Sequence, residues 1–202
     1  MKLLLLSKGL SAISKVIPDS SKTYKIAFIP TAADTYENKS FIEEDREKLS
    51  NMGFHLTEYD IKQKNKEQLL NELQSFDALY ITGGNSFYLL NKAQQSGFAE
   101  VVKILVEKGI VYIGGSAGAA VAGKSIEPVA LLDDPSKAPE LHSTDGFGFV
   151  DFVILPHYGK EKYADLYKKI IAQYKDQYKL VTITDKQAIL VDENGYQLVS
   201  SL

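Results

Sequence analysis

Short apolar segments alternate with helical segments along most of this chain, and this alternation restricts its fold more than any other feature. The segments between the apolar runs carry apolar residues at the three- and four-residue spacing of a helix. Such a chain folds into a mostly parallel sheet with helices on both faces, an α/β fold. Strands are predicted at 3–6, 24–29, 54–60, 78–82, 110–113, 152–155 and 180–184, helices at 40–52, 65–73, 86–95, 98–108 and 162–174, and a closing hairpin at 188–191 and 196–199.

Composition favours one globular domain over residues 1–202. Of the 202 residues, 45% are hydrophobic and 24% are charged, which is enough for a sizeable core. The 23 basic and 26 acidic residues are interspersed and give a formal net charge of −3, so we expect no basic face for a nucleic acid. The chain has no cysteine, which excludes disulfides, thiolate nucleophiles and cysteine zinc sites.

The N-terminal residues begin like a signal peptide, but their apolar run, Leu3 to Leu6, is only four residues long and no small-residue cleavage site follows it. We therefore predict a buried strand at this point. No later apolar run approaches the ~20 residues of a membrane span. Together these observations predict a cytoplasmic protein without a membrane partner.

The segment Gly114-Gly115-Ser116-Ala117-Gly118 matches the G-x-S-x-G pattern of a nucleophile elbow, a sharp turn from a strand into a helix. Glycines at 114 and 118 fit this turn, because one avoids a Cβ clash and the other lets strand and helix approach closely. The serine hydroxyl would then be exposed at the start of the helix, where N–H groups can hold an oxyanion. A tight turn that serves packing alone uses the same small residues, so the pentapeptide does not decide between the two interpretations.

Polar or glycine-rich residues follow four of the predicted strands, and we expect these strand ends at one edge of the sheet. They are Thr82 to Asn85, Gly115-Ser116, Pro156-His157 and Thr184-Asp185. Open α/β sheets bind ligands beyond the carboxyl ends of their strands. The longest irregular segment, residues 124–148, is expected to form either a lid over this site or a surface loop.

A serine nucleophile needs a base, and the chain has three histidines. His55 begins a strand far from any carboxyl end, and His142 lies in the irregular segment, where a surface position is expected. His157 follows a buried strand and a proline at a carboxyl end. We therefore predict that His157 is the base.

The acid that orients the base has two groups of candidates. If it precedes the histidine it is Asp133, Asp134, Asp145 or Asp151, and if it follows the histidine it is Asp185, Asp192 or Glu193. Asp185 directly ends a predicted strand, whereas the hairpin turn explains Asp192 and Glu193, and Asp133 and Asp134 are expected in a solvated loop. Position therefore favours Asp185.

Three motifs together resemble the peptidase E family of α-aspartyl dipeptidases, to which cyanophycinases are more distantly similar. The motifs are Tyr80 to Leu90, Gly114 to Ala119 and Pro156-His157-Tyr158, and the resemblance extends from Leu3 to Asp185. It implies a sheet related to class I glutamine amidotransferases and a serine peptidase that forms an acyl-enzyme. It also implies that Ser116 is the nucleophile, His157 the base and Asp185 the acid, with the N–H groups of Gly84 and Ala117 as the oxyanion hole.

The sequence departs from the dipeptidases in two places. In the dipeptidases, a long segment with a Gly- and Arg-containing stretch follows the histidine and is associated with binding the aspartate side chain, but Tyr158 to Tyr163 contains no arginine. Arg46, on an early predicted helix, is the only arginine in the chain. Gly115 stands where the dipeptidases often carry a bulky aromatic residue. Aspartyl specificity therefore does not follow from the resemblance.

The sequence thus predicts a serine peptidase of short peptides that needs no metal or organic cofactor, with Asn85, Tyr158 and Lys160 among its substrate contacts. Lys160 or Lys162 can supply a point charge, and a homo-oligomer is compatible with the sequence. Two alternatives are a hydrolase of another amide or ester, and a sensor or scaffold that has kept the fold and lost the chemistry. Nucleotide binding by the Gly83-Gly84-Asn85 loop is disfavoured, because the loop lacks the Lys-Ser/Thr end of a P-loop and the G-x-G-x-x-G spacing.

Overall fold

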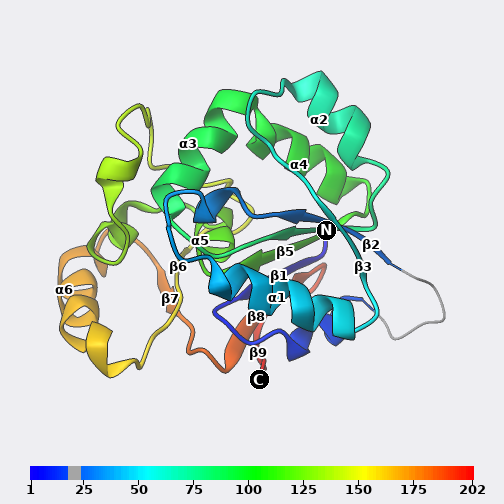
Figure 1. Cartoon of the computed structure of the whole chain (residues 1–202). Coiled ribbons are helices and arrows are strands. Elements are labelled where there is room, and N and C mark those ends of the chain that lie inside the picture. The colour runs from blue at the N-terminus through cyan, green and yellow to red at the C-terminus, as the bar shows by residue number, and fades with distance from the viewer. Residues whose placement is uncertain (18–23) are drawn as a thin grey trace.

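The computed structural model describes residues 1–17 and 24–202, and its main feature is a seven-stranded sheet (Figure 1). The strands lie in the order β3-β2-β4-β5-β1-β8-β9. The first five are parallel, whereas β8 is antiparallel to β1 and β9 is antiparallel to β8. The predicted mostly parallel sheet and C-terminal hairpin are therefore confirmed. The bounds are β1 (Leu3–Leu6), β2 (Lys25–Ile29), β3 (His55–Glu58), β4 (Ala78–Ile81), β5 (Val111–Gly115), β8 (Gln187–Asp192) and β9 (Gly195–Ser200).

The inner strands are continuous apolar runs because helices cover both faces of the sheet. In β1, Leu3 and Leu5 pack into the core on one face and Leu4 and Leu6 into the core on the other, and all four are fully buried. Helix α1 (Ser40–Asn51) and the 3₁₀ helix η1 (Ser11–Lys15) cover the face of Leu4 and Leu6. The other face is covered by α2 (Lys66–Leu73), α3 (Ser86–Ser96), α4 (Phe98–Glu107) and α5 (Ala117–Ala122). Helix α6 (Ala164–Tyr174) lies to one side of the sheet, where it packs against Glu127–Leu131 and Glu161–Tyr163 (Figure 1).

Local sequence signals set the helix boundaries. Asn65 and Gln68 form a reciprocal capping box at the start of α2, and Asn85 caps α3 by accepting a hydrogen bond from the N–H of Tyr88. Gly97, with φ 73°, separates α3 from α4. The five predicted helices are confirmed, with ends shifted by at most two residues. None of the helices in the described ranges is long and apolar enough to span a bilayer.

Two predicted strands do not join the main sheet. Strands β6 (Val153–Leu155) and β7 (Leu180–Thr182) pair in parallel with each other as a separate two-stranded sheet. The expectation that all four polar strand ends belong to one sheet is therefore wrong. Strands β4 and β1 already flank β5, so the strand that leads to Ser116 has no free edge, and the edges of the main sheet are β3 and β9. Strand β6 packs against α5 instead.

The irregular segment 124–148 is anchored along its length. It contains two short 3₁₀ helices, η3 (Glu127–Leu131) and η4 (Pro135–Lys137), and a β-bridge joins Ser125 to Asp145. Phe147 is buried near its end and packs edge-on against the rings of Phe98 and Tyr112. Further 3₁₀ turns are η2 (Thr31–Ala33), after β2, and η5 (Glu161–Tyr163), before α6.

Candidate active site

The turn after β5 has the geometry predicted for a nucleophile elbow. Ser116 has φ 47° and ψ −100°, a conformation that residues with a Cβ rarely adopt. A Cβ on Gly114 would lie 2.4 Å from the carbonyl oxygen of Gly118, and a Cβ on Gly118 would lie 2.4 Å from that of Ile81. Both positions therefore need glycine, which lets α5 start directly after the serine and pack against β4 and β5.

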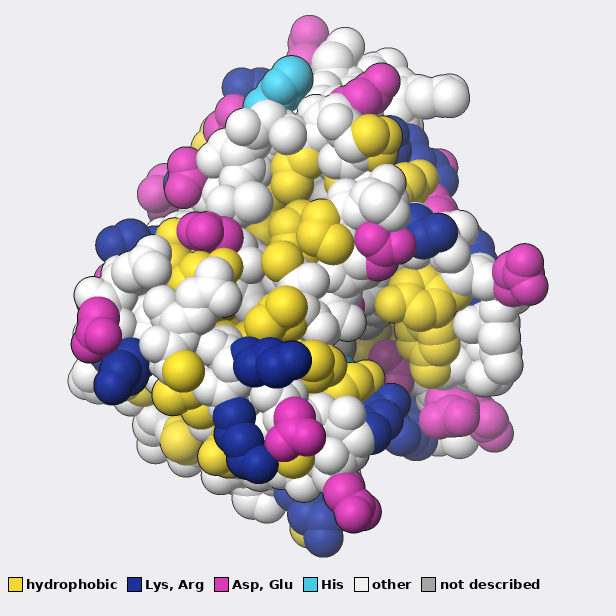
Figure 2. Space-filling view, turned by 90° about the vertical axis from the view of Figure 1, so that its left-hand side faces the viewer, with side chains coloured by type: hydrophobic (Ala, Val, Ile, Leu, Met, Phe, Trp, Pro, Cys, Tyr) yellow, Lys and Arg dark blue, Asp and Glu magenta, His cyan; other side chains and the backbone are white. Residues whose placement is uncertain are grey.

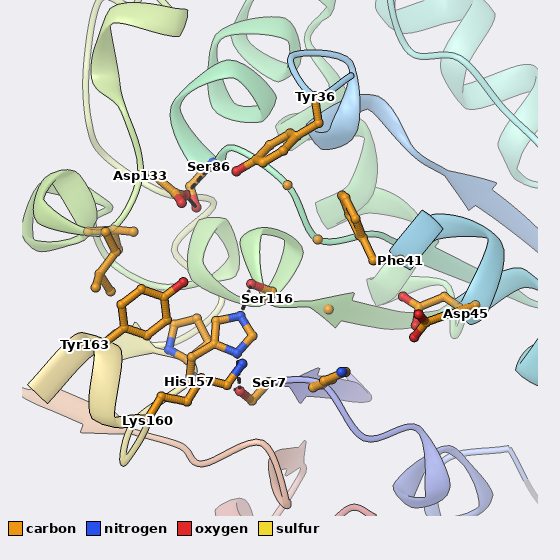
Figure 3. Close-up of a pocket in the computed structure, with 18 of the residues that line it drawn as sticks. Ser7, Tyr36, Phe41, Asp45, Ser86, Ser116, Asp133, His157, Lys160 and Tyr163 are labelled. Atoms are coloured by element: carbon orange, nitrogen blue, oxygen red, sulfur yellow. Dashed lines mark hydrogen bonds between the residues drawn. The ribbon is translucent and has the colours of Figure 1, made fainter. Parts of the chain in front are cut away.

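Ser116, His157 and Asp185 form one line of hydrogen-bonded side chains, of which Figure 3 shows the first two. Ser116 Oγ is 2.8 Å from Nε2 of His157, and Nδ1 of His157 is 2.6 Å from Oδ1 of Asp185. A carboxylate only accepts hydrogen bonds, so we assign the proton to Nδ1, which leaves Nε2 to accept from the Ser116 hydroxyl. His157 follows β6 and Asp185 follows β7, so the pairing of these two strands brings the imidazole and the carboxylate together.

The carboxylate of Asp185 has two further partners. The hydroxyl of Ser7, just after β1, donates to Oδ1 at 2.9 Å, and Nζ of Lys160 lies 2.7 Å from Oδ2. Burial alone would raise the pKa of Asp185, but the hydrogen bonds from Lys160, His157 and Ser7 lower it to about 2. Asp185 is therefore ionised at neutral pH. Lys160, predicted as a substrate contact, lines the cavity beside Ser116 but pairs its charge with Asp185.

Burial lowers the pKa of His157 below its usual value, and the charge of Lys160 acts in the same direction. The hydrogen bond and charge of Asp185 oppose this shift without cancelling it. The imidazole is therefore neutral at neutral pH, the state in which it can accept a proton.

A cavity of about 370 Å³ opens at Ser116. Figure 2 shows the hollowed face of the molecule, with acidic, basic and hydrophobic side chains around the hollow. Three of the four predicted strand ends line the cavity, and Asp185, from the fourth, stands behind His157. The other lining side chains are aromatic (Tyr36, Phe41, Tyr80, Tyr163), acidic (Glu44, Asp45, Asp133), basic (Lys8, Lys160, Lys162), aliphatic (Val129, Leu132) or serine (Ser7, Ser86). Among residues 1–17 and 24–202, no three His, Asp or Glu side chains are grouped as metal ligands.

Asp133 lies in the wall of this cavity, which corrects its predicted place in a solvated loop. Its Oδ2 accepts hydrogen bonds from the N–H of Ser86 at 2.8 Å and from the hydroxyl of Ser86 at 2.6 Å. Burial raises the pKa of Asp133 in spite of these bonds. No lysine or arginine in the described part of the chain forms an ion pair with it. The neighbouring Asp134 is exposed, as predicted, and caps η4.

Two predicted substrate contacts lie outside the cavity lining. The amide of Asn85, which is 2% exposed, caps α3 and donates to the carbonyl of Asp134 at 3.0 Å, so its oxygen and nitrogen are both used by the fold. Tyr158 packs edge-on against Tyr167, next to a different surface pocket. Their role as substrate contacts therefore stays a prediction, without support from the cavity lining. His55 and His142 are exposed and lie outside the cavity lining.

The loop after β4 approaches the serine closely. Gly84 has φ 143°, and a Cβ there would collide with the carbonyl of Ala32 at 2.2 Å, so only glycine fits. A Cβ on Gly83 would lie 3.3 Å from the Cβ of Ser116. Within the described ranges, no hydrogen bond uses the N–H of Gly84 or Ala117, the two groups predicted as an oxyanion hole.

Sequence reasoning missed Ser7 and misplaced Asp133. Ser7 gave no signal, because a single serine after a strand is common and its partners His157 and Asp185 are 150 and 178 residues away along the chain. Asp133 offered a weak signal: it directly follows the apolar residues Val129 to Leu132, of which two line the cavity.

Comparisons with known proteins assign the chain to a family. A model of peptidase family S51 matches residues 3–199. An uncharacterized peptidase of Listeria innocua is 32% identical over 82% of this chain and 79% of its own length, and one of Pasteurella multocida is 32% identical over 83% and 81%. Peptidase E of a Nostoc species is 31% identical over 68% of this chain, which spans only 54% of that longer protein.

Solved structures agree with this assignment. A crystal structure of a Listeria monocytogenes protein described as peptidase E has a TM-score of 0.90 at 26% identity, and the match covers 100% of this chain and 98% of that one. A peptidase from an acI-B1 actinobacterium has a TM-score of 0.72 over 99% and 87%, and at 21% identity it shows the shared fold alone. The resemblance found in the sequence is confirmed: this chain belongs to peptidase family S51, among the relatives of peptidase E.

Proposed function

We propose that this chain is a serine peptidase of short peptides, with Ser116 as nucleophile, His157 as general base and Asp185 as the acid that orients the base. The observation that carries the proposal is the line from Ser116 Oγ to His157 Nε2, at 2.8 Å, and from His157 Nδ1 to Asp185 Oδ1, at 2.6 Å. Membership of a peptidase family supports a reaction on a peptide bond. The strained serine at the mouth of a cavity supports the serine mechanism.

The reaction begins when Nε2 of His157 takes the proton of Ser116 as its Oγ attacks the scissile carbonyl carbon. The N–H groups of Gly84 and Ala117 are suited to receive the oxyanion, because no described residue occupies them. The C–N bond then breaks and the imidazolium gives its proton to the leaving amine. Water attacks the acyl-enzyme with His157 again as base, the bond between the acyl carbon and Oγ breaks, and the Ser116 hydroxyl is restored.

We propose that the carboxylate of Asp133 binds the free amino terminus of the substrate peptide. In Figure 3 its carboxylate lies beside Ser86 on one side of Ser116, facing the cavity. A carboxylate in the wall of a cavity is stabilised when it pairs with a positive charge, and no lysine or arginine of the described residues forms an ion pair with Asp133. A peptide bound with its first carbonyl at Ser116 brings its α-ammonium group into this region. The enzyme is therefore expected to act as an exopeptidase on the first residue.

The cavity is poorly suited to an aspartate side chain. Arg46 is held elsewhere, with Nη2 2.5 Å from Glu58 and the guanidinium 4.5 Å over the ring of Phe28. Lys160 is paired with Asp185, and the carboxylates of Glu44 and Asp45 lie in the wall. We therefore infer that a neutral first residue is preferred to an acidic one.

Ser116→Ala tests the proposal. Hydrolysis of a panel of unblocked di- and tripeptides should fall by about a thousandfold or more, while the circular dichroism spectrum stays unchanged. A fluorophosphonate probe should label the wild type and Ser125→Ala, a control at a buried serine outside the site, but not Ser116→Ala. Peptide hydrolysis that survives Ser116→Ala would reject the assignment. Hydrolysis of esters alone would favour another hydrolase, and a folded wild type that resists the probe would favour a binding protein.

A further inference from the structure

The end of β1 forms hydrogen bonds with the backbone of Ser116 and His157, the two residues of the proposed catalytic triad that have a positive φ. The carbonyl of Leu6 accepts a hydrogen bond from the N–H of Ser116 at 2.8 Å, and the next residue, Ser7, accepts one from the N–H of His157 through its hydroxyl, also at 2.8 Å. The φ angles of Ser116 and His157 are 47° and 64°. Such conformations persist only when surrounding contacts hold them in place.

The hydroxyl of Ser7 is fully engaged with the base and the acid. It accepts from the backbone of His157, donates to Oδ1 of Asp185 at 2.9 Å and lies 3.3 Å from Nδ1 of His157. Ser7 is 2% exposed and stands below His157 in Figure 3. The hydroxyl therefore contacts both ends of the bond between the imidazole and the carboxylate.

The nucleophile and its two partners belong to different sheets. Ser116 follows β5 of the main sheet, in which Leu6 of β1 pairs with Gly115. His157 and Asp185 follow the strands of the two-stranded sheet, and no β-ladder joins that sheet to the main one. Ser7 stands on the main-sheet side of this division and bonds to both residues on the other side.

We propose that Ser7 is a positioning residue that fixes His157 and Asp185 of the small sheet against Ser116 of the main sheet. The proposal rests on the proposed function, because it gives Ser7 a task in that reaction. A hydroxyl suits the task since it donates to a carboxylate and accepts from a backbone N–H at the same time. Alanine can do neither, whereas threonine can do both.

The test compares kcat and KM for peptide hydrolysis by Ser7→Ala, Ser7→Thr and the control Ser125→Ala. Ser125 is also 2% exposed, and its hydroxyl also bonds to backbone groups, of Thr144 and Glu127, away from the cavity. Because a small misplacement of reacting groups is costly, Ser7→Ala should lower kcat by about ten- to a hundredfold with KM within about threefold of wild type. Ser7→Thr should recover most of the rate, and Ser125→Ala should leave both constants unchanged.

A double-mutant cycle with Asp185→Asn separates positioning from a general loss of stability. If Ser7 acts through Asp185 and His157, Ser7→Ala will cost far less in the Asp185→Asn background than in the wild type. Equal fold-losses in the two backgrounds, or an unchanged kcat in Ser7→Ala, would overturn the proposal. If Ser7→Ala does not fold, Ser7→Cys replaces it, because the thiol keeps a similar volume but makes weaker hydrogen bonds.

Failure of the proposed function gives a different result, namely hydrolysis that survives Ser116→Ala whatever the Ser7 variants do. If no peptide of the panel is turned over, the rate at which the fluorophosphonate labels Ser116 replaces kcat in the same cycle. That rate reports activation of the nucleophile without depending on the peptide chosen.

Discussion

Backbone strain coincides with the candidate site at the level of single residues. Of the described residues, three that are not glycine have a positive φ, and two of them are Ser116 and His157. Each such conformation costs roughly 1–3 kcal/mol. Glycine would avoid the cost but would carry neither a hydroxyl nor an imidazole. A reactive side chain thus stands at each of two positions, 116 and 157, where glycine would be less strained. This favours a catalytic role for the turn at Ser116 over a role in packing alone.

Replacement of Lys160 should move the pH dependence of the reaction. The positive charge of Lys160 destabilises the imidazolium of His157, so Lys160→Met raises the pKa of His157 from its lowered value. The base must be neutral to accept a proton, so the acidic limb of the kcat/KM profile should move to higher pH. Lys162→Met is the control, because Nζ of Lys162 lies over the ring of Tyr163 and does not pair with Asp185. An acidic limb that stays in place or moves to lower pH would contradict the prediction.

Asp133→Asn should weaken the binding of peptides with a free amino terminus. The amide keeps the shape and can still accept from Ser86, but it no longer offers a charge to the α-ammonium group. A charge-assisted hydrogen bond contributes about 1.5–3 kcal/mol, so KM should rise by about tenfold or more. Asp134→Asn, which changes the exposed neighbour, should have no effect. Steady-state kinetics on paired free and N-acetylated peptides check this, and an equal effect on both members of a pair would reject the assigned role.

Single residues differed in how far the sequence revealed them. Ser116, His157 and Asp185 each follow a recognisable strand, so local patterns were enough to nominate them, and the structure brings them together. Ser7 and Asp133 depend on contacts with Asp185 and Ser86 that lie far away in the chain. No local pattern encodes such contacts. Asn85 lies inside a family motif, and its side chain caps α3, which was not predicted from the sequence.

At the level of elements, the close packing of α5 on β4 depends on Gly118. Alanine there would gain about 1 kcal/mol in helix propensity. Its Cβ, however, would lie 2.4 Å from the carbonyl oxygen of Ile81, and a strand backbone yields little. We expect Gly118→Ala to lower the free energy of unfolding by about 2 kcal/mol, as overpacking does. In Gly115→Ala the nearest atom to the Cβ would be the hydroxyl oxygen of Tyr80, at 3.2 Å, and the nearest backbone atom would be 3.7 Å away, so the loss should be smaller. Urea unfolding of both variants measures the difference, and equal stabilities would refute it.

Which elements form was easier to predict than which sheet they join. Apolar runs and helical spacing identified every strand of the main sheet and all five longer helices. Strands β6 and β7 have three residues each, and a run of two or three apolar residues has the same pattern in a large or a small sheet. That β5 has no free edge for them is a property of the assembled fold and not of the local sequence.

At the level of the whole molecule, the cavity is assembled from segments that span most of the chain. Its wall combines the end of β1, residues of α1, the elbow, residues 129–133 and the turn before α6. The segment 124–148 therefore contributes side chains to the wall through Val129, Leu132 and Asp133, while its role as a lid stays a prediction. The charged side chains of the cavity come from segments that are distant in the sequence. The numbers of acidic and basic residues in the chain are nearly equal, so composition could not predict which charges gather in the cavity.

The distribution of charge in the cavity predicts discrimination between two isosteric substrates. Asp-Leu and Asn-Leu differ only by a charge on the first side chain. The wall carries three carboxylates, of Glu44, Asp45 and Asp133, against the two lysines Lys8 and Lys162, because Lys160 is paired with Asp185. Like charges brought together in a partly dry site repel strongly, so kcat/KM should be about tenfold or more higher for Asn-Leu. Since salt screens charges near solvent, the ratio should shrink between roughly 0.05 M and 0.5 M ionic strength, whereas a ratio set by shape would not change. A preference for Asp-Leu would contradict the prediction, and it would mean that Lys8 or Lys162 pairs with the aspartate side chain of the substrate.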